Sequence, residues 1–166
     1  MKPSIPKLLV GGLKLSPEIV QIRLFPKAGY PVEEMFGRLA DRKINLTGVV
    51  LEANDGHLNG IGCILAEDRL SAEEALRNFE GSFEMLASVG TLTIFPHQAR
   101  PELFARLLSA LGSSGIPVYG IVSSFSSLTI TMDYQRLDEA VSVVCSIVRL
   151  PENHAPFRPE FRVKQL

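Results

Sequence analysis

Apolar and polar residues alternate along the chain with two different periods. From Val20 to Leu24 every second residue is apolar, which predicts a strand with one buried face. After a short polar loop, Pro31 suits the first turn of a helix, because its missing N–H would have no partner there. The apolar residues that follow recur at steps of three and four and predict a helix with one buried stripe: Val32, Met35, Phe36, Leu39, Ala40 and Ile44.

The next residues predict a hairpin and a second helix. Residues 46–53 and 58–66 are apolar runs separated by Asn54-Asp55-Gly56, which has the composition of a hairpin turn. Ser71 and Glu74 have the spacing of a capping box and predict that a helix opens at Ser71, while Gly81 is suited to close it. Residues 83–87 fit either a closing strand or an extension of that helix.

The stretch from Phe25 to Val50 recurs in outline from Phe95 to Val122. Both copies pass from a strand through Phe-Pro into a helix that ends before Gly-Val-Val or Gly-Ile-Val, at offsets of 95 − 25 = 70 and 120 − 48 = 72 residues. A repeat at this spacing predicts two small modules of one design. The second copy contains a strand with Leu92 and Ile94, a helix with Phe104, Leu107, Leu108 and Leu111, strands at 118–122 and 128–132, and a helix with Leu137, Ala140, Val141, Val144, Cys145 and Val148.

We therefore divide the chain into an N-terminal arm (1–17), module one (18–87), module two (88–150) and a C-terminal tail (151–166). Each module has the order strand, helix, strand, strand, helix, and its fourth strand is poorly marked. For module two, the candidate is Phe161 to Val163, and the N-terminal run around Leu8-Leu9-Val10 is a candidate for one of the two open positions. Because small modules bury little surface alone and edge strands invite pairing, we expect a symmetric homodimer.

Composition narrows the location and the partners. The chain is 46% hydrophobic and 21% charged, and it has neither a run long enough to span a bilayer nor the apolar core of a signal peptide, so the cytoplasm is the expected location. A net charge of −1 with scattered Lys and Arg argues against nucleic acid and membrane partners. Cys63 and Cys145 lie in apolar elements and are expected to be buried. The three histidines lack metal-site spacing and are expected at the surface, so no metal or cofactor is predicted.

Several short segments resemble the ACT domain family, in particular the tandem pair that forms the regulatory region of aspartate kinases. In module one these are Gly29-Tyr30, Phe36-Gly37-Arg38-Leu39 and Ile44-Asn45-Leu46; in module two they are Ile116-Pro117-Val118 and the serine-rich turn within Ser123 to Ile130. No phosphate loop or Mg-binding carboxylate cluster accompanies them. The sequence therefore looks like a regulatory module without its enzyme.

The resemblance implies an α+β fold of two ferredoxin-like βαββαβ modules, with antiparallel sheets and helices on one face. It also implies a small effector, such as an amino acid, held at a module interface by the first loop and the start of the second strand. A helix N-terminus offers free N–H groups to a carboxylate there, and Gly29 would let the backbone approach closely. The matching positions are Lys27, Ala28, Gly29, Tyr30, Asn45, Leu46 and Thr47 in module one, and His97, Gln98, Ala99, Arg100, Pro117, Val118 and Tyr119 in module two.

For several of these residues, an explanation that needs no ligand or catalysis fits equally well or better. Gly29 fits a tight turn as well as a binding loop, Arg100 fits a solvated side chain as well as a carboxylate clamp, and the serine run fits a turn better than a nucleophile. Our leading hypothesis is a non-enzymatic, effector-sensing homodimer that acts on a partner enzyme. The alternative is a protein-interaction scaffold without a small-molecule ligand, and an enzyme is the weakest reading, since no acid, base or metal constellation is present.

Overall fold

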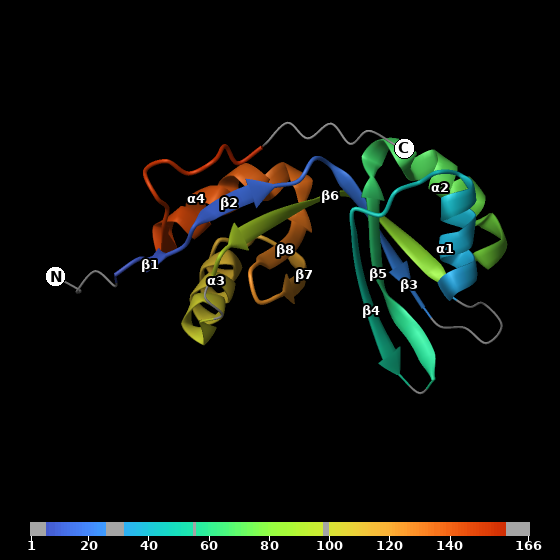
Figure 1. Ribbon diagram of the computed structural model, residues 1–166, viewed down its shortest axis with the longest axis horizontal. Coiled ribbons are helices and arrows are strands. Elements are labelled where there is room, and N and C mark those ends of the chain that lie inside the picture. The colour runs from blue at the N-terminus through green and yellow to red at the C-terminus, as the bar shows by residue number, and fades with distance from the viewer. Residues whose placement is uncertain (1–5, 26–31, 55, 98–99, 159–166) are drawn as a thin grey trace. The chain divides into compact units, whose positions relative to one another are not determined.

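The computed structural model describes residues 6–25, 32–54, 56–97 and 100–158. Over these residues the chain combines antiparallel strands with four α-helices (Figure 1). It divides into two compact units, which we call the inserted unit (Glu18–Val89) and the split unit (Met1–Pro17 with Gly90–Leu166). The inserted unit thus interrupts the split unit along the sequence, and each is described by itself below.

The inserted unit contains β3 (Ile19–Leu24), α1 (Val32–Asp41), β4 (Gly48–Asn54), β5 (His57–Leu65), α2 (Arg69–Ala75) and the first part of β6 (Phe83–Phe95). Its strands lie in the order β4-β5-β3-β6, and each neighbouring pair is antiparallel. The alternation in β3 turns Val20, Ile22 and Leu24 toward α1, where Val32, Met35 and Leu39 join them in one buried cluster. The period-two and period-3.6 patterns therefore meet in a single core.

The start of α2 differs from the predicted capping box. A short 3-10 turn (Ala66–Asp68) follows β5 and leads directly into α2, so that Ser71 lies inside the helix and not at its cap. Glu74 does not reach back to the helix start, because its carboxylate accepts a hydrogen bond of 2.9 Å from Arg42 after α1. A second 3-10 turn (Arg77–Phe79) follows α2, and Gly81 adopts a left-handed φ of +78° before β6. Of the two readings of residues 83–87, the strand is confirmed.

The split unit contains the second part of β6, α3 (Pro101–Ser113), β7 (Val118–Ser123), β8 (Leu128–Asp133), a 3-10 turn (Tyr134–Arg136) and α4 (Leu137–Ile147). Its fourth strand is β2 (Gly12–Leu15), which pairs antiparallel with β6 from Gly12 opposite Phe95 to Leu15 opposite Leu92. The N-terminal arm therefore fills one open strand position, through residues that follow the predicted run Leu8-Leu9-Val10, whereas Phe161 to Val163 lies outside the described residues. Two-residue strands β1 (Leu8–Leu9) and β9 (Val148–Arg149) pair in parallel beside it.

Strand β6 serves both units. Its first part pairs with β3 in the inserted unit, and its second part lies between β2 and β8 in the split unit. In both units, neighbouring strands consequently follow the same order. The second strand of the unit lies at one edge, followed by the third, the first and then the fourth. The predicted division between residues 87 and 88 falls inside this strand, close to a left-handed residue, Ser88, at φ +56°.

In some helices the set of buried side chains differs from the apolar stripe predicted from the sequence. In α3 the buried side chains are Leu103, Leu107 and Leu111, whereas Leu108 is 50% exposed. Residues four apart face the same direction on a helix, so this set defines the buried line, and Leu108 lies to one side of it. Ala40 in α1 is likewise exposed, and in α4 the buried line is Leu137, Ala140, Val144 and Ile147, with Val141 and Cys145 half-buried.

Candidate functional site

Of the module-one candidates, Lys27, Ala28, Gly29 and Tyr30 lie outside the described residues. The other segment, Asn45 to Thr47, leads from α1 into β4, with Asn45 and Thr47 exposed and Leu46 packed against the core. Thr47 is bound to β5 through its backbone N–H (2.7 Å) and its hydroxyl (3.2 Å), which both donate to the carbonyl oxygen of Cys63. The Thr47 hydroxyl thus keeps only its acceptor capacity for a ligand.

The module-two loop follows β6 and leads into α3. His97 is buried with 2% of its surface exposed, so the expectation of a surface histidine is wrong at this position. Its ring lies edge-on to Phe104 of α3, with 5.9 Å between centroids, and its Nε2 is 2.9 Å from the carbonyl oxygen of Ser124. His97 therefore ties the loop after β6 to the turn after β7. Gln98 and Ala99 lie outside the described residues.

Arg100 occupies the cap position of α3, and Pro101 is the first residue of the helix, as the repeat had suggested for Pro31 in module one. The Arg100 side chain is exposed, and no side chain caps the helix start by a hydrogen bond. The first N–H groups of such a helix carry a partial positive charge that favours an anion. The loop end of α3 thus places a cation beside the helix start, where Pro101 has no N–H and the N–H of Leu103 donates to the carbonyl oxygen of Arg100 at 3.0 Å.

The other module-two segment, Pro117 to Tyr119, follows the opposite end of α3. That end closes through a tight turn in which the N–H groups of Gly115 and Ile116 donate to the carbonyl oxygens of Gly112 and Leu111 at 3.1 Å. Pro117 is exposed, Val118 and Tyr119 are half-buried, and Val118 packs against the core of the split unit. The core thereby fixes the start of β7.

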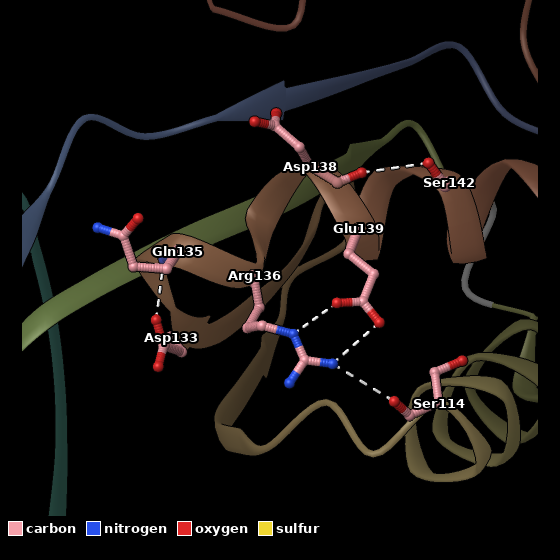
Figure 2. Close-up of polar contacts among 7 residues, drawn as sticks. All are labelled: Ser114, Asp133, Gln135, Arg136, Asp138, Glu139 and Ser142. Carbon is pink, nitrogen blue, oxygen red and sulfur yellow. Dashed lines mark hydrogen bonds and ion pairs between the residues drawn. The ribbon is translucent and has the colours of Figure 1, made fainter.

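Arg136, at the start of α4, holds the turn that precedes this segment (Figure 2). Its guanidinium donates to the Glu139 carboxylate through two nitrogens and to the carbonyl oxygen of Ser114 at 3.4 Å. The hydrogen bonds from Arg136 lower the pKa of Glu139, so this carboxylate stays ionised at neutral pH. Beside it, the Asp133 carboxylate accepts a 2.8 Å bond from the N–H of Gln135. The cluster fixes the approach to β7 and contains no acid or base pair aimed at a substrate.

One copy of the split unit does not bring its two candidate segments together. They lie at opposite ends of α3, whose 13 residues span about 20 Å at 1.5 Å per residue. A single amino acid cannot contact both ends of such a helix. His97 instead lies beside the turn Ser124 to Ser127, as its bond to Ser124 shows.

That serine turn is closed by its own hydrogen bonds. The Ser124 N–H donates to the Ser127 carbonyl (2.8 Å), the Ser127 N–H donates to the Ser124 hydroxyl (3.1 Å), and the two hydroxyls lie 3.0 Å apart. At its tip Phe125 is 95% exposed. The sequence pattern predicted a turn here, and Phe125 was not singled out. A phenylalanine inside a run of serines nevertheless indicates an aromatic side chain on a polar, exposed segment.

The described residues offer little for catalysis. Among them, no group of three His, Cys, Asp or Glu side chains could hold a metal ion. Both cysteines are half-buried, not fully buried as expected, and desolvation raises the pKa of the Cys63 thiol to about 11, which leaves it protonated and poorly nucleophilic at neutral pH. No helix in the described part of the chain is long and apolar enough to cross a membrane.

No protein-family model matches the sequence, and no curated protein is significantly similar to it. Among solved structures the chain is similar to the regulatory subunit of aspartate kinase from Thermus thermophilus, at 19% identity and a TM-score of 0.70, covering 84% of this chain and 99% of that chain. The corresponding subunit from Thermus flavus gives 20%, 0.70, 83% and 97%. Aspartate kinase from Synechocystis gives 16% and 0.70 over 88% of this chain and 28% of that chain. At these identities the comparisons establish the fold, which is that of aspartate kinase regulatory subunits, as the resemblance predicted.

Proposed function

We propose that this chain is a non-enzymatic regulatory protein with two ACT-type modules, which binds a small carboxylate-bearing effector, an amino acid, and acts on a partner enzyme as a homodimer. The observation that carries the proposal is the repeated sheet order, in which a helix N-terminus follows directly on the first strand of each unit. Fold likeness to aspartate kinase regulatory subunits supports the same role. The positive end of the α3 dipole with Arg100 beside it suits a carboxylate, and among the described residues no group of three His, Cys, Asp or Glu side chains could hold a metal ion.

The 20 Å separation along α3 leads to a specific arrangement of the site. If an effector contacts both candidate segments, one segment comes from a second copy of the chain. β7 is the edge strand of the split unit, and an antiparallel pairing of β7 with its copy about a twofold axis sets the start of one strand beside the end of the other. His97 lies at the end of β7, where it is bonded to Ser124, so the partner's Pro117 to Tyr119 would face it.

Module one fits the same scheme. Its edge strand is β4, where Val49 and Leu51 are 45% and 37% exposed. Asn45 to Thr47 precede β4 at the far end of α1, a helix of 10 residues and about 15 Å. Antiparallel pairing of β4 with a second copy would set this segment beside the end of the partner's β4, while the candidates Lys27 to Tyr30 lie outside the described residues.

A thermal-shift screen of the full chain against each common amino acid tests the proposal. An effector present at a hundred times its Kd stabilises the folded state by about 2.7 kcal/mol, which corresponds to a rise in Tm of roughly 5 to 10 °C for a chain of this length. Gly29→Val should abolish the rise if module one binds, and Arg100→Ala should reduce it if module two binds. Arg149→Ala, which removes an exposed arginine from β9, is the control.

The outcomes separate the two functional hypotheses. A rise that survives both Gly29→Val and Arg100→Ala means that the effector binds elsewhere. No rise with any amino acid, in a sample that remains dimeric, would favour the interaction scaffold over the effector sensor. Turnover of any added compound would contradict the non-enzymatic assignment.

A further inference from the structure

Two connections join the inserted unit to the split unit, and they lie side by side. The chain crosses at residues 17–18, between β2 and β3, and again at residues 89–90, inside β6. Next to both crossings, the N–H of Ser16 donates to the carbonyl oxygen of Thr91 (3.0 Å), and the N–H of Thr91 donates to the Ser16 hydroxyl (2.9 Å). The two crossings therefore belong to one two-stranded ribbon.

The strand pairing in this ribbon is irregular at two places. From Leu15 opposite Leu92 to Ile19 opposite Val89, the side of β2 and β3 advances by four residues and β6 by three. One residue within 16–18 is therefore in excess. Two residues that face one on the partner strand form a β-bulge, which interrupts the ladder, bends the strand and increases its twist.

A second bulge follows on the opposite strand. From Ile19 opposite Val89 to Gln21 opposite Leu86, β3 advances by two residues and β6 by three, so one residue within 87–88 is in excess. Because the two bulges lie on different strands, the second restores the register that the first had shifted. Only the pair of Ile19 and Val89 lies between them, and the regular ladder of each unit begins beyond.

Both bulges contain residues that suit an irregular backbone. Ser88 has a left-handed φ of +56°, which costs free energy for a residue with a side chain. Pro17 has no N–H to donate to a ladder. Gly90, by contrast, is packed so closely on the split unit that an added Cβ atom would lie 2.6 Å from Leu137. The irregular backbone is thus confined to a few residues, and β6 is firmly held where it enters the split unit.

We propose that the two bulges form a hinge about which the inserted unit and the split unit change their relative orientation as rigid bodies. Hinges are a few residues at the ends of elements that absorb large changes in φ and ψ, and here they are residues 16–20 and 87–89. The hinge goes beyond the proposed function, because it operates with or without an effector. A ligand or partner that contacts both units would bind one orientation better and shift the population toward it.

Distances between spin labels, measured by pulsed electron paramagnetic resonance on the full chain, report the range of orientations. In a background of Cys63→Ala and Cys145→Ala, labels at Leu70→Cys on α2 and Leu108→Cys on α3 lie in different units, at side chains that are 77% and 50% exposed. Leu108→Cys with Gln135→Cys is the control pair within the split unit. The labelled chain is diluted with unlabelled parent chain, so that only distances within one chain are measured. The distance distribution between units should be broader than that of the control pair, and an equally narrow one overturns the hinge.

Removal of one residue from each bulge tests where the hinge lies. Deletion of Pro17 together with Ser88 keeps the register on both sides and leaves a continuous ladder, so the distribution between units should narrow toward that of the control pair. Either deletion alone shifts the register by one residue and turns side chains to the wrong face, so each should lower Tm further than the double deletion does. A folded double deletion with an unchanged distribution overturns the assignment.

A point substitution tests the same hinge without relying on the fold of a deletion variant. Ser88→Gly keeps the bulge but admits φ values on both sides of zero, so the distribution between units should widen. Ser126→Gly, in the exposed turn after β7, is the matched control and should leave it unchanged. A distribution that Ser88→Gly leaves unaltered or narrows contradicts the hinge. These readouts need no amino acid, so they fail or succeed separately from the thermal-shift screen of the proposed function.

Discussion

Gly90 marks the point where β6 passes closest to the start of α4, and its replacement tests how tightly the split unit is packed. A Cβ atom at this position would lie 2.6 Å from Cδ1 and 3.1 Å from Cγ of Leu137, and 3.0 Å from Cδ2 of Tyr134. Leu137 has no exposed surface and belongs to the core cluster, so its side chain has little room to move away. Gly90→Ala therefore overpacks the core.

The magnitude follows from two opposing effects. Overpacking a core typically costs about 1 to 3 kcal/mol, while replacing glycine with alanine at an ordinary backbone conformation gains about 0.4 to 1 kcal/mol through the unfolded state. The net loss is up to about 2.6 kcal/mol, or a fall in Tm of up to roughly 10 °C. Thermal unfolding followed by circular dichroism measures it.

Gly112→Ala is the matched control, because a Cβ atom there meets nothing within 4 Å and alanine favours the helix by roughly 0.5 to 1 kcal/mol, so Tm should rise.

A double-mutant cycle isolates the contact. Leu137→Ala alone leaves a cavity and should destabilise strongly, but in that background the added methyl group of Gly90→Ala has space. The cost of Gly90→Ala should therefore shrink or change sign when Leu137 is absent. An equal cost in both backgrounds, or a Tm for Gly90→Ala at or above that of the parent, would refute the packing argument.

Two further perturbations concern the charged surface and the sheet edge. Arg42 lowers the pKa of Glu74 through a hydrogen bond, so the stability from this pair is present above the ordinary glutamate pKa and is lost as pH falls through the lower folded value. Arg42→Gln should therefore flatten the acid-side fall in Tm, and an unchanged fall would contradict this reasoning. Val122→Lys places a charge on the edge strand β7 and should shift the mass measured by light scattering from dimer to monomer. An unchanged mass would rule out β7 as the dimer edge.

Local patterns predicted most of the helices and strands. The errors concern which side of a helix is buried and where a helix begins, because both depend on the elements that pack against it. Residues 128–132 alternate cleanly and form β8, and the second helix of module two begins at Leu137 as predicted. The stripe of α3 was misplaced because Leu107 and Leu108 are adjacent and equally apolar, so only the sheet decides which of them is buried. The start of α2 was misplaced because the turn Ala66 to Asp68 supplies the entry that a capping box would otherwise provide.

Long-range pairing was the harder part of the fold to predict. The run Leu13-Lys14-Leu15 alternates, yet three residues cannot indicate which unit they join, and their partner strand lies some 80 positions further on, at Leu92 to Phe95. The same limit applied to β6. A 13-residue strand shared by two sheets is not visible in a pattern that treats each module separately. His97 was misjudged for a related reason, because its bonding partner Ser124 lies 27 positions further on, and its contact with Phe104 depends on how α3 packs.

The same limit applies to the candidate site, because segments next to one helix in the sequence need not be close together in space. The resemblance assigned two segments to each module from their positions beside one helix, and a helix is a rigid rod with a fixed rise, so its two ends cannot approach each other. The 13 residues of α3 keep Arg100 and Pro117 on opposite sides of the module whatever the effector. A ligand small enough to be an amino acid must therefore use one end alone or draw the second segment from another module. Because β7 is an uncharged edge with Ile121 and Val122 exposed, the second course also covers apolar surface, and dimerisation and effector binding would then stabilise each other.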